Sequence, residues 1–301
     1  MFRQAKQTNV FIILIIILAS VHTYSVDLKS SDPVQGLALG VDHTCVSIYN
    51  KVKCWGDDDH GYLDVPEGLN NVVQISAGAG HTCVLDKVRG VVCWGQDDYR
   101  QLSPPSDLVN PQIIGSGAFH SCAVTEGRVK CWGSNHYGQL NVPSDLQNVV
   151  ELAVGRTHAC AITDSKDIVC WGYSGGSDRR LTPPTGLKNP RQIRSHGYHS
   201  CVNSDDGFFC WGSNEYGESR ISKRYNSKPS MVVPGVRNSC ALFEGQVECW
   251  GNNGSGELEI PDGLDQVLQV AIGDHHVCAS TQKSIRCWGY NGFGEVINID
   301  F

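Results

Sequence analysis

Residues 131–163 read CWGSNHYGQLNVPSDLQNVVELAVGRTHACAIT, and the parts of this stretch return along the chain. Its Cys-Trp-Gly tripeptide contains every tryptophan of the 301-residue sequence, at intervals of 38 to 40 residues. A fixed period of this length indicates a solenoid, a propeller or another repeat array. The seven tryptophans are Trp55, Trp94, Trp132, Trp171, Trp211, Trp250 and Trp288.

The segments around these tripeptides are typical of short β-strands, because they are rich in Val, Ile and Cys and are bounded by Gly, Asn, Asp and Pro. The chain after residue 25 has no sustained helical period. Three or four strands in each of seven repeats predict an all-β fold, a seven-bladed β-propeller built from repeats of about 39 residues. An open β-solenoid is the structural alternative. We expect residues 34–40 to form the first strand and residues 296–301 the last, and a shared blade is one way for them to close the ring.

The fourteen cysteines form one pair per repeat, with its members 9 or 10 residues apart and a turn between them. A hairpin places such cysteines on neighbouring antiparallel strands, where opposite positions lie about 4.5 Å apart, within disulfide range. The alternative, a zinc site in every repeat made of His-x-Cys and the second cysteine, is not expected. The predicted disulfides are Cys45–Cys54, Cys83–Cys93, Cys122–Cys131, Cys160–Cys170, Cys201–Cys210, Cys240–Cys249 and Cys278–Cys287.

A histidine precedes the first cysteine by two residues in every repeat except the sixth, where Asn238 replaces it. We expect these histidines to be structural and to hydrogen-bond the Gly turn before them. The tryptophans are expected to pack between blades, because a large apolar face suits a contact between sheets. The histidines are His43, His81, His120, His158, His199 and His276.

The N-terminal segment has the layout of a secretory signal peptide, since Arg3 and Lys6 precede the apolar residues 10–19 and small or polar residues follow. The apolar run is about half the ~20 residues that a membrane-spanning helix needs. We therefore predict a signal peptide over residues 1–25 and a propeller over residues 26–301, with no membrane span in the mature chain. The product would be secreted and extracellular, where cysteines form disulfides. An uncleaved anchor is the alternative.

The charge of the chain excludes one class of partner. It carries 24 Lys+Arg against 31 Asp+Glu, a net charge of -7, with no long basic run. Proteins that grip nucleic acid neutralise phosphates with clustered Lys and Arg, so no nucleic-acid partner is expected. We also expect a monomer with no cofactor and no metal. Residues 172–176 fit G-x-S-x-G, but no helix pattern follows, so a Gly-rich loop is preferred to a nucleophile elbow and no catalytic residue is assigned.

Two stretches are candidates for binding or modification. The fifth repeat lacks the usual Gln-Leu-x-x-Pro element and gathers basic residues and a tyrosine there, which interfaces favour. An ordinary exposed loop is the alternative. Asn253 begins the glycosylation sequon Asn-Gly-Ser, although its position also suits a structural turn residue. The candidate partner-binding loop comprises Arg220, Lys223, Arg224, Tyr225 and Lys228.

The unit quoted above resembles the regulator of chromosome condensation repeat. Both family signatures, G-x-x-H-S-x-A-L and W-G-x-N-x-x-G-Q-L, are visible, the second in residues 133–140. The resemblance covers about residues 34–296 and implies a seven-bladed β-propeller. The short period and the Cys-Trp-Gly units are similar to two extracellular branches, the propeller-type secreted β-lactamase inhibitor of bacteria and the crinkly-repeat ectodomain of plant receptor kinases.

These observations predict a secreted, non-enzymatic propeller that binds an extracellular protein, as an interaction scaffold or an inhibitor-like module. The alternative is an extracellular carbohydrate-binding lectin, which would repeat one aromatic and polar pocket in several blades. A guanine-nucleotide exchange-type regulator, the role of the nuclear family member, is disfavoured by the signal peptide, the cysteine pairs and the lack of a basic tail. The loop aromatics available to a lectin are Tyr62, Tyr99, Tyr137, Tyr216 and Phe293.

Overall fold

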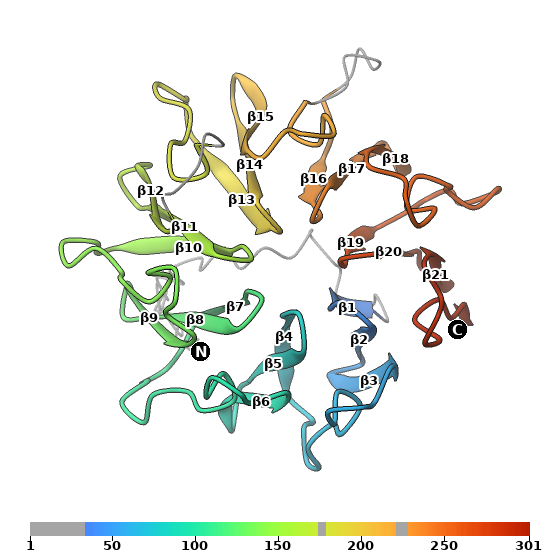
Figure 1. Ribbon diagram of the computed structural model, residues 1–301, viewed down its shortest axis with the longest axis horizontal. Coiled ribbons are helices and arrows are strands. Elements are labelled where there is room, and N and C mark those ends of the chain that lie inside the picture. The colour runs from blue at the N-terminus through green and yellow to red at the C-terminus, as the bar shows by residue number, and fades with distance from the viewer. Residues whose placement is uncertain (1–33, 174–178, 221–227) are drawn as a thin grey trace, which may run out of the picture.

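The computed structural model describes residues 34–173, 179–220 and 228–301, so the predicted signal peptide lies outside the described residues. Within them the chain forms twenty-two β-strands and no helix. The strands make seven separate sheets arranged in a ring around one axis (Figure 1). The predicted seven-bladed β-propeller is confirmed.

Each blade contains an antiparallel meander of three strands, to which blade 7 adds a short fourth, and the first strand lies nearest the axis with the third farther out (Figure 1). The blades are numbered 1 to 7 in chain order. The first strands are β1 (Val34–Leu39), β4 (Val72–Ala77), β7 (Ile113–Ser116), β10 (Val149–Val154), β13 (Arg191–His196), β16 (Met231–Pro234) and β19 (Gln269–Ile272). The second strands are β2 (His43–Ile48), β5 (His81–Asp86), β8 (His120–Thr125), β11 (His158–Thr163), β14 (His199–Ser204), β17 (Asn238–Phe243) and β20 (His276–Ser280). The third strands are β3 (Lys51–Gly56), β6 (Gly90–Gly95), β9 (Arg128–Gly133), β12 (Ile168–Gly172), β15 (Gly207–Gly212), β18 (Gln246–Gly251) and β21 (Ser284–Gly289).

The ring does not close through a blade shared by the two ends of the chain. β1 lies in the sheet of blade 1, whereas the short β22 (Ile299–Asp300) pairs with β21 as a fourth strand of blade 7. The seam between these two blades carries a Trp55 indole bond to the Glu295 carbonyl at 2.8 Å and a backbone bond from Asp274 to Gly40 at 3.2 Å. The suggestion of a shared blade is therefore wrong, because this seam is held by contacts between two complete blades.

All seven predicted disulfides are present, and each joins the second and third strands of one blade. The paired cysteines stand directly opposite each other in the register, with Cα atoms 4.0 to 4.1 Å apart. No cysteine of the described chain is free. Each bridge closes a loop of about ten residues, which contributes about 2.7 kcal/mol in the chain-entropy model. The bridges therefore cross-link the hairpin of every blade.

The tryptophans join neighbouring blades, as predicted. Each indole Nε1 donates to a backbone carbonyl in the segment that ends the preceding blade, at 2.8 to 3.1 Å. Six of the rings are at most 7% exposed, and Trp250 is half-buried. The pairs are Trp55 with Glu295, Trp94 with Tyr62, Trp132 with Gln101, Trp171 with Gln139, Trp211 with Arg180, Trp250 with Glu218 and Trp288 with Glu257.

The buried histidines also join blades, which corrects the expected bond to their own Gly turn. In five of the six seam histidines the ring Nε2 pairs with a hydroxyl of the next blade at 2.7 to 2.9 Å. The turn glycine serves the ring sterically, because a Cβ at Gly40 would lie only 2.2 Å from the His43 ring. The pairs are His43–Thr82, His81–Ser121, His158–Ser200, His199–Ser239 and His276–Thr44.

Two seams lack this histidine–hydroxyl bond for different reasons. Between blades 3 and 4, Ala159 occupies the position of the hydroxyl, and neither ring nitrogen of His120 has a hydrogen-bond partner within the described residues. Between blades 6 and 7, Asn238 and Val277 replace both members of the pair. The seam of His120 therefore buries a polar ring without a hydroxyl partner, which is energetically unfavourable.

We predict that Ala159→Ser stabilises the protein by about 1 kcal/mol, because the new hydroxyl pairs with the His120 ring and satisfies a buried nitrogen. Urea unfolding with the disulfides intact measures the change. Ala161→Ser is the matched control, since Ala161 is equally buried two residues along β11 and would gain an unsatisfied hydroxyl that destabilises the fold. Destabilisation by both substitutions would contradict the assignment of the missing acceptor.

We predict that stability falls as the pH decreases below 6.5. Burial lowers the pKa of His43 to about 4 and that of His81, His120, His199 and His276 to about 3, from the ordinary 6.5. In this range the unfolded chain binds more protons than the folded one, so each histidine removes about 1.4 kcal/mol of unfolding free energy per pH unit. Denaturant unfolding at several pH values checks the slope. His199→Asn places at this position the residue of the sixth repeat, and it should reduce the dependence of the unfolding free energy on pH by the contribution of one histidine, about 1.4 kcal/mol per pH unit. An unchanged slope would contradict the assignment of the pH dependence to the buried histidines.

Candidate functional site

Two sets of loops meet on one side of the ring, which we call the loop face. One set consists of the turns between first and second strands, and the other follows the third strands. They share a side because the first and third strands of an antiparallel meander run in the same direction. The described turns are residues 40–42, 78–80, 117–119, 155–157, 197–198, 235–237 and 273–275, and the segments are 57–63, 96–102, 134–140, 173 with 179–181, 213–219, 252–258 and 290–296.

The segments of the loop face are held in one conformation by their own side chains. In six blades an Asn or Asp oxygen accepts the backbone N–H five residues later, at 2.9 to 3.2 Å. In five blades a buried Gln or Glu accepts the N–H two residues earlier, at 2.7 to 2.9 Å. Asn253 makes the first of these bonds to Leu258, so its structural turn role is confirmed. The glycosylation of the exposed Asn253 stays a prediction.

An aromatic side chain projects from the middle of several segments. Tyr99, Tyr137, Tyr216 and Phe293 stand five residues after the tryptophan of their blade and are 39% to 52% exposed. Tyr62, which the sequence grouped with them, stands seven residues after its tryptophan and takes the place of the buried Gln or Glu. Four of the five predicted loop aromatics are thus equivalent and accessible to a partner.

The surroundings of these aromatics differ from blade to blade. Tyr99 packs against Phe119 with ring centroids 5.3 Å apart, whereas Tyr137 packs edge-on against Tyr173. Tyr216 carries the Arg237 guanidinium 5.5 Å from its ring centroid. A lectin of the expected kind would repeat one pocket in several blades, and these contacts do not repeat.

The charge of the loop face is divided between opposite sides of the axis. Blades 1 and 2 carry Asp57, Asp58, Asp59, Asp97 and Asp98, and Figure 1 places these blades across the ring from blades 4 to 6. Burial, followed by the charges of nearby aspartates of blades 1 and 2, raises the pKa of the Tyr62 hydroxyl above its ordinary value. The acidic side therefore repels further negative charge.

Arginines stacked on tyrosines occupy the other side. The Arg180 guanidinium lies 4.9 Å from the Tyr173 ring centroid and 5.0 Å from that of Tyr198, and Arg156 lies 5.9 Å from Tyr198. Such stacking fixes a guanidinium while leaving its edge available for hydrogen bonds.

The axis of the ring contains a cavity of about 250 Å³ lined by the first strands. At the loop face, Arg156 of blade 4 reaches across to Asp274 of blade 7, with 2.6 Å between Nη1 and Oδ2. This ion pair joins two turns that are 118 residues apart.

In the described part of the chain no His, Cys, Asp and Glu side chains are grouped as a metal site would require. Of the G-x-S-x-G stretch only Gly172 and Tyr173 are described, and its serine lies outside the described residues.

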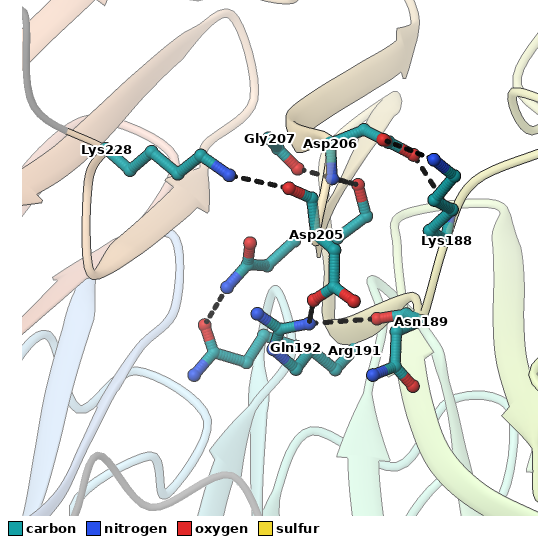
Figure 2. Close-up of polar contacts among 10 residues, drawn as sticks. Lys188, Asn189, Arg191, Gln192, Asp205, Asp206, Gly207 and Lys228 are labelled. Atoms are coloured by element: carbon teal, nitrogen blue, oxygen red, sulfur yellow. Dashed lines mark hydrogen bonds and ion pairs between the residues drawn. The ribbon is translucent and has the colours of Figure 1, made fainter.

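The predicted basic loop is described only at its ends, since Lys223, Arg224 and Tyr225 lie outside the described residues. Arg220 is exposed after the segment of blade 5. Lys228 donates to the Asp205 carbonyl at 2.7 Å, in the turn between β14 and β15 (Figure 2). That turn lies at the end of blade 5 opposite the loop face, so the structure commits Lys228 to the other side of the ring.

The same corner of blade 5 is held by ion pairs, as Figure 2 shows. Arg191 contacts the Asp205 carboxylate at 2.8 Å and also donates to the Asn189 carbonyl. The hydrogen bond from Arg191 holds the pKa of the Asp205 carboxyl below its ordinary value. These contacts anchor the turn and leave the binding role of the basic loop as a prediction.

Comparison with known proteins agrees with this architecture. The model of the regulator of chromosome condensation (RCC1) repeat matches residues 72–101, 113–139 and 149–176. The CRINKLY WD40 ectodomain of the receptor kinase ACR4 from Arabidopsis thaliana is 22% identical, with 88% of this chain and 98% of that chain covered and a TM-score of 0.69. The ectodomain of the receptor kinase CR4 from Physcomitrella patens is 23% identical over 85% and 73% of the two chains, with a TM-score of 0.69.

Prp20p from Saccharomyces cerevisiae, for which binding to Gsp1p and histones is described, is also similar. It is 20% identical over 80% of each chain, with a TM-score of 0.67. No curated protein matches the chain. Among the residues that the structure describes, no helix could span a membrane. At these identities the likeness to solved structures establishes the fold alone.

Proposed function

We propose that this chain, three stretches of which match the regulator of chromosome condensation repeat, is a secreted, non-enzymatic propeller that binds another extracellular protein through its loop face. One observation carries the proposal: a rigid face exposes tyrosines and arginines whose surroundings differ in each blade. Tyr and Arg dominate the residues that contribute most to protein–protein affinity. A non-repeating surface suits one large partner better than several identical small ligands.

Secretion is supported by the cysteines. The chain forms seven disulfides, and disulfides form and persist in oxidising compartments such as the extracellular space. One similar structure is the ectodomain of a receptor kinase, which agrees with an extracellular setting. Prp20p, described as binding Gsp1p and histones, provides a precedent for protein binding on this fold, but the exchange activity of the nuclear family member stays disfavoured for a disulfide-linked chain.

The non-enzymatic part of the proposal is supported by the role of the perturbed groups. Burial lowers the pKa of five histidines, His43, His81, His120, His199 and His276, far below the ordinary value. Perturbed titratable groups in a cleft are the usual mark of an active site. Four of these five histidines instead pair with a hydroxyl of the next blade, so structure accounts for them.

We propose that Asn253 is glycosylated if the host modifies such sequons. Asn253 is exposed, and its Oδ1 accepts the Leu258 N–H at 2.9 Å. The expected result is a mass decrease of the secreted protein after treatment with an N-glycosidase. The same treatment should leave Asn253→Gln unchanged, and an untreated mass equal to that of the bare polypeptide would contradict the assignment.

The loop face is tested by partner capture from extracellular fluid. We expect Tyr137→Ala and Tyr216→Ala each to weaken binding of the captured partner by about 2 kcal/mol, roughly a 30-fold increase in Kd, because each substitution removes an exposed aromatic side chain. Tyr49→Ala is the matched control, since Tyr49 is 66% exposed in the turn between β2 and β3, away from the loop face. Equal loss in all three variants would contradict the assignment of the face. Binding confined to a glycan array, with no protein captured, would favour the lectin.

A further inference from the structure

The geometry points to an acidic protein segment as the partner, docked on one sector of the loop face that spans blades 4, 5 and 6. We call this surface the Arg–Tyr sector. The inference rests on the proposed function and adds the chemistry of the partner and the place where it binds. The sector is defined by Arg156, Tyr173, Arg180, Tyr198, Tyr216 and Arg237.

Arg180 supplies a positive charge that is fixed before any partner arrives. Its guanidinium lies between Tyr173 and Tyr198, 4.9 and 5.0 Å from their ring centroids, and its Nη1 donates to the Thr157 hydroxyl at 2.8 Å. The residue is only 9% exposed. An arginine held in this way loses little conformational entropy on binding, which favours affinity.

Arg237 supplies the accessible charge of the sector. It is exposed in the turn between β16 and β17, with its guanidinium 5.5 Å from the ring centroid of Tyr216. In the described part of the chain no ion pair involves Arg237. Among the described residues of the blade 5 segment, the Glu215 side chain is exposed, whereas the Glu218 carboxylate is buried and accepts hydrogen bonds from the Ser213 hydroxyl and the Tyr216 N–H. Arg237 is thus an exposed cation beside an exposed aromatic ring.

One carboxylate already sits on the sector. Asp274 reaches from blade 7 and bonds Arg156 at 2.6 Å, beside the ring of Tyr198. A planar guanidinium forms its strongest hydrogen bonds with carboxylates and phosphates. This internal pair shows the chemistry that the sector accepts, and an external Asp or Glu would meet Arg237 in the same way.

The charges on the rest of the loop face also favour binding of an acidic segment at the Arg–Tyr sector. The chain has a net charge of -7, and the side of the ring across from the sector carries Asp57, Asp58, Asp59, Asp97 and Asp98. An acidic segment is repelled there and attracted to blades 4 to 6, so the charges guide both its approach and its position.

The test uses the whole secreted protein and a defined probe, a fluorescein-labelled hexaglutamate peptide, followed by fluorescence anisotropy at low ionic strength. We expect binding that weakens as salt rises and an affinity about tenfold or more lower in Arg237→Glu, since one close charge pair contributes about 1.4 kcal/mol or more. Arg237→Lys should fall between the two, because it keeps the charge and loses the planar fork. Lys53→Glu is the matched control, with the same charge change on exposed β3 of blade 1.

Several results would overturn the inference. They are no binding of hexaglutamate, an equal loss in Lys53→Glu and Arg237→Glu, and tighter binding of a hexalysine peptide that Arg237→Glu leaves unchanged. Sedimentation velocity covers another occupant: self-association that Arg237→Glu abolishes would assign the sector to the acidic blades of a second copy. A captured partner that Tyr137→Ala releases and Arg237→Glu does not would leave the proposed function standing and remove this inference.

Discussion

The bond from each tryptophan to the preceding blade is the contact on which the rest of the structure depends. A three-stranded sheet cannot bury both of its faces alone, so every blade needs a neighbour on each side. The indole covers that contact and gives its N–H to a carbonyl of the neighbour's last segment. The residue that offers the carbonyl, such as Gln101 or Gln139, also bonds its own segment through its side chain. Packing between blades therefore shapes the loop face directly.

The contacts between neighbouring blades follow one pattern, but the His–hydroxyl pair is not present at every seam. Where His and a hydroxyl face each other, a buried ring nitrogen is satisfied. Where Asn238 stands, the facing residue is Val277, so that seam loses the ring and the hydroxyl together. Among the seam histidines, all of which the structure describes, only His120 has a ring Nε2 without a hydrogen-bond partner. The Ser or Thr that follows most of these histidines is therefore the partner of the histidine of the preceding blade.

The fold and the disulfides could be predicted from the sequence. The fold follows from the 38- to 40-residue interval between tryptophans, and the disulfides follow from the 9 or 10 residues between paired cysteines. Counting from each tryptophan would also have separated Tyr62 from Tyr99. The hydroxyl partners of the histidines had a signal too, the Ser or Thr that precedes most first cysteines, but a hydrogen bond between repeats is invisible within one repeat. The pair of Arg156 and Asp274 had none, because it spans 118 residues and occurs once. Contacts across the axis depend on ring closure, which no local pattern encodes.

The division of labour within the repeat explains why the loop face, rather than the irregular fifth repeat, carries the binding proposal. The Gly, His, Asn and buried Gln or Glu positions hold each loop and cannot vary freely. The residue before each histidine, or before Asn238 in blade 6, has no such task, and it is Phe119, Thr157, Tyr198, Arg237 or His275 in different blades. Lys228 of the fifth repeat, by contrast, is already bound to Asp205. The positions that can vary without disturbing the fold therefore lie on the loop face, where one partner would contact a different side chain in each blade.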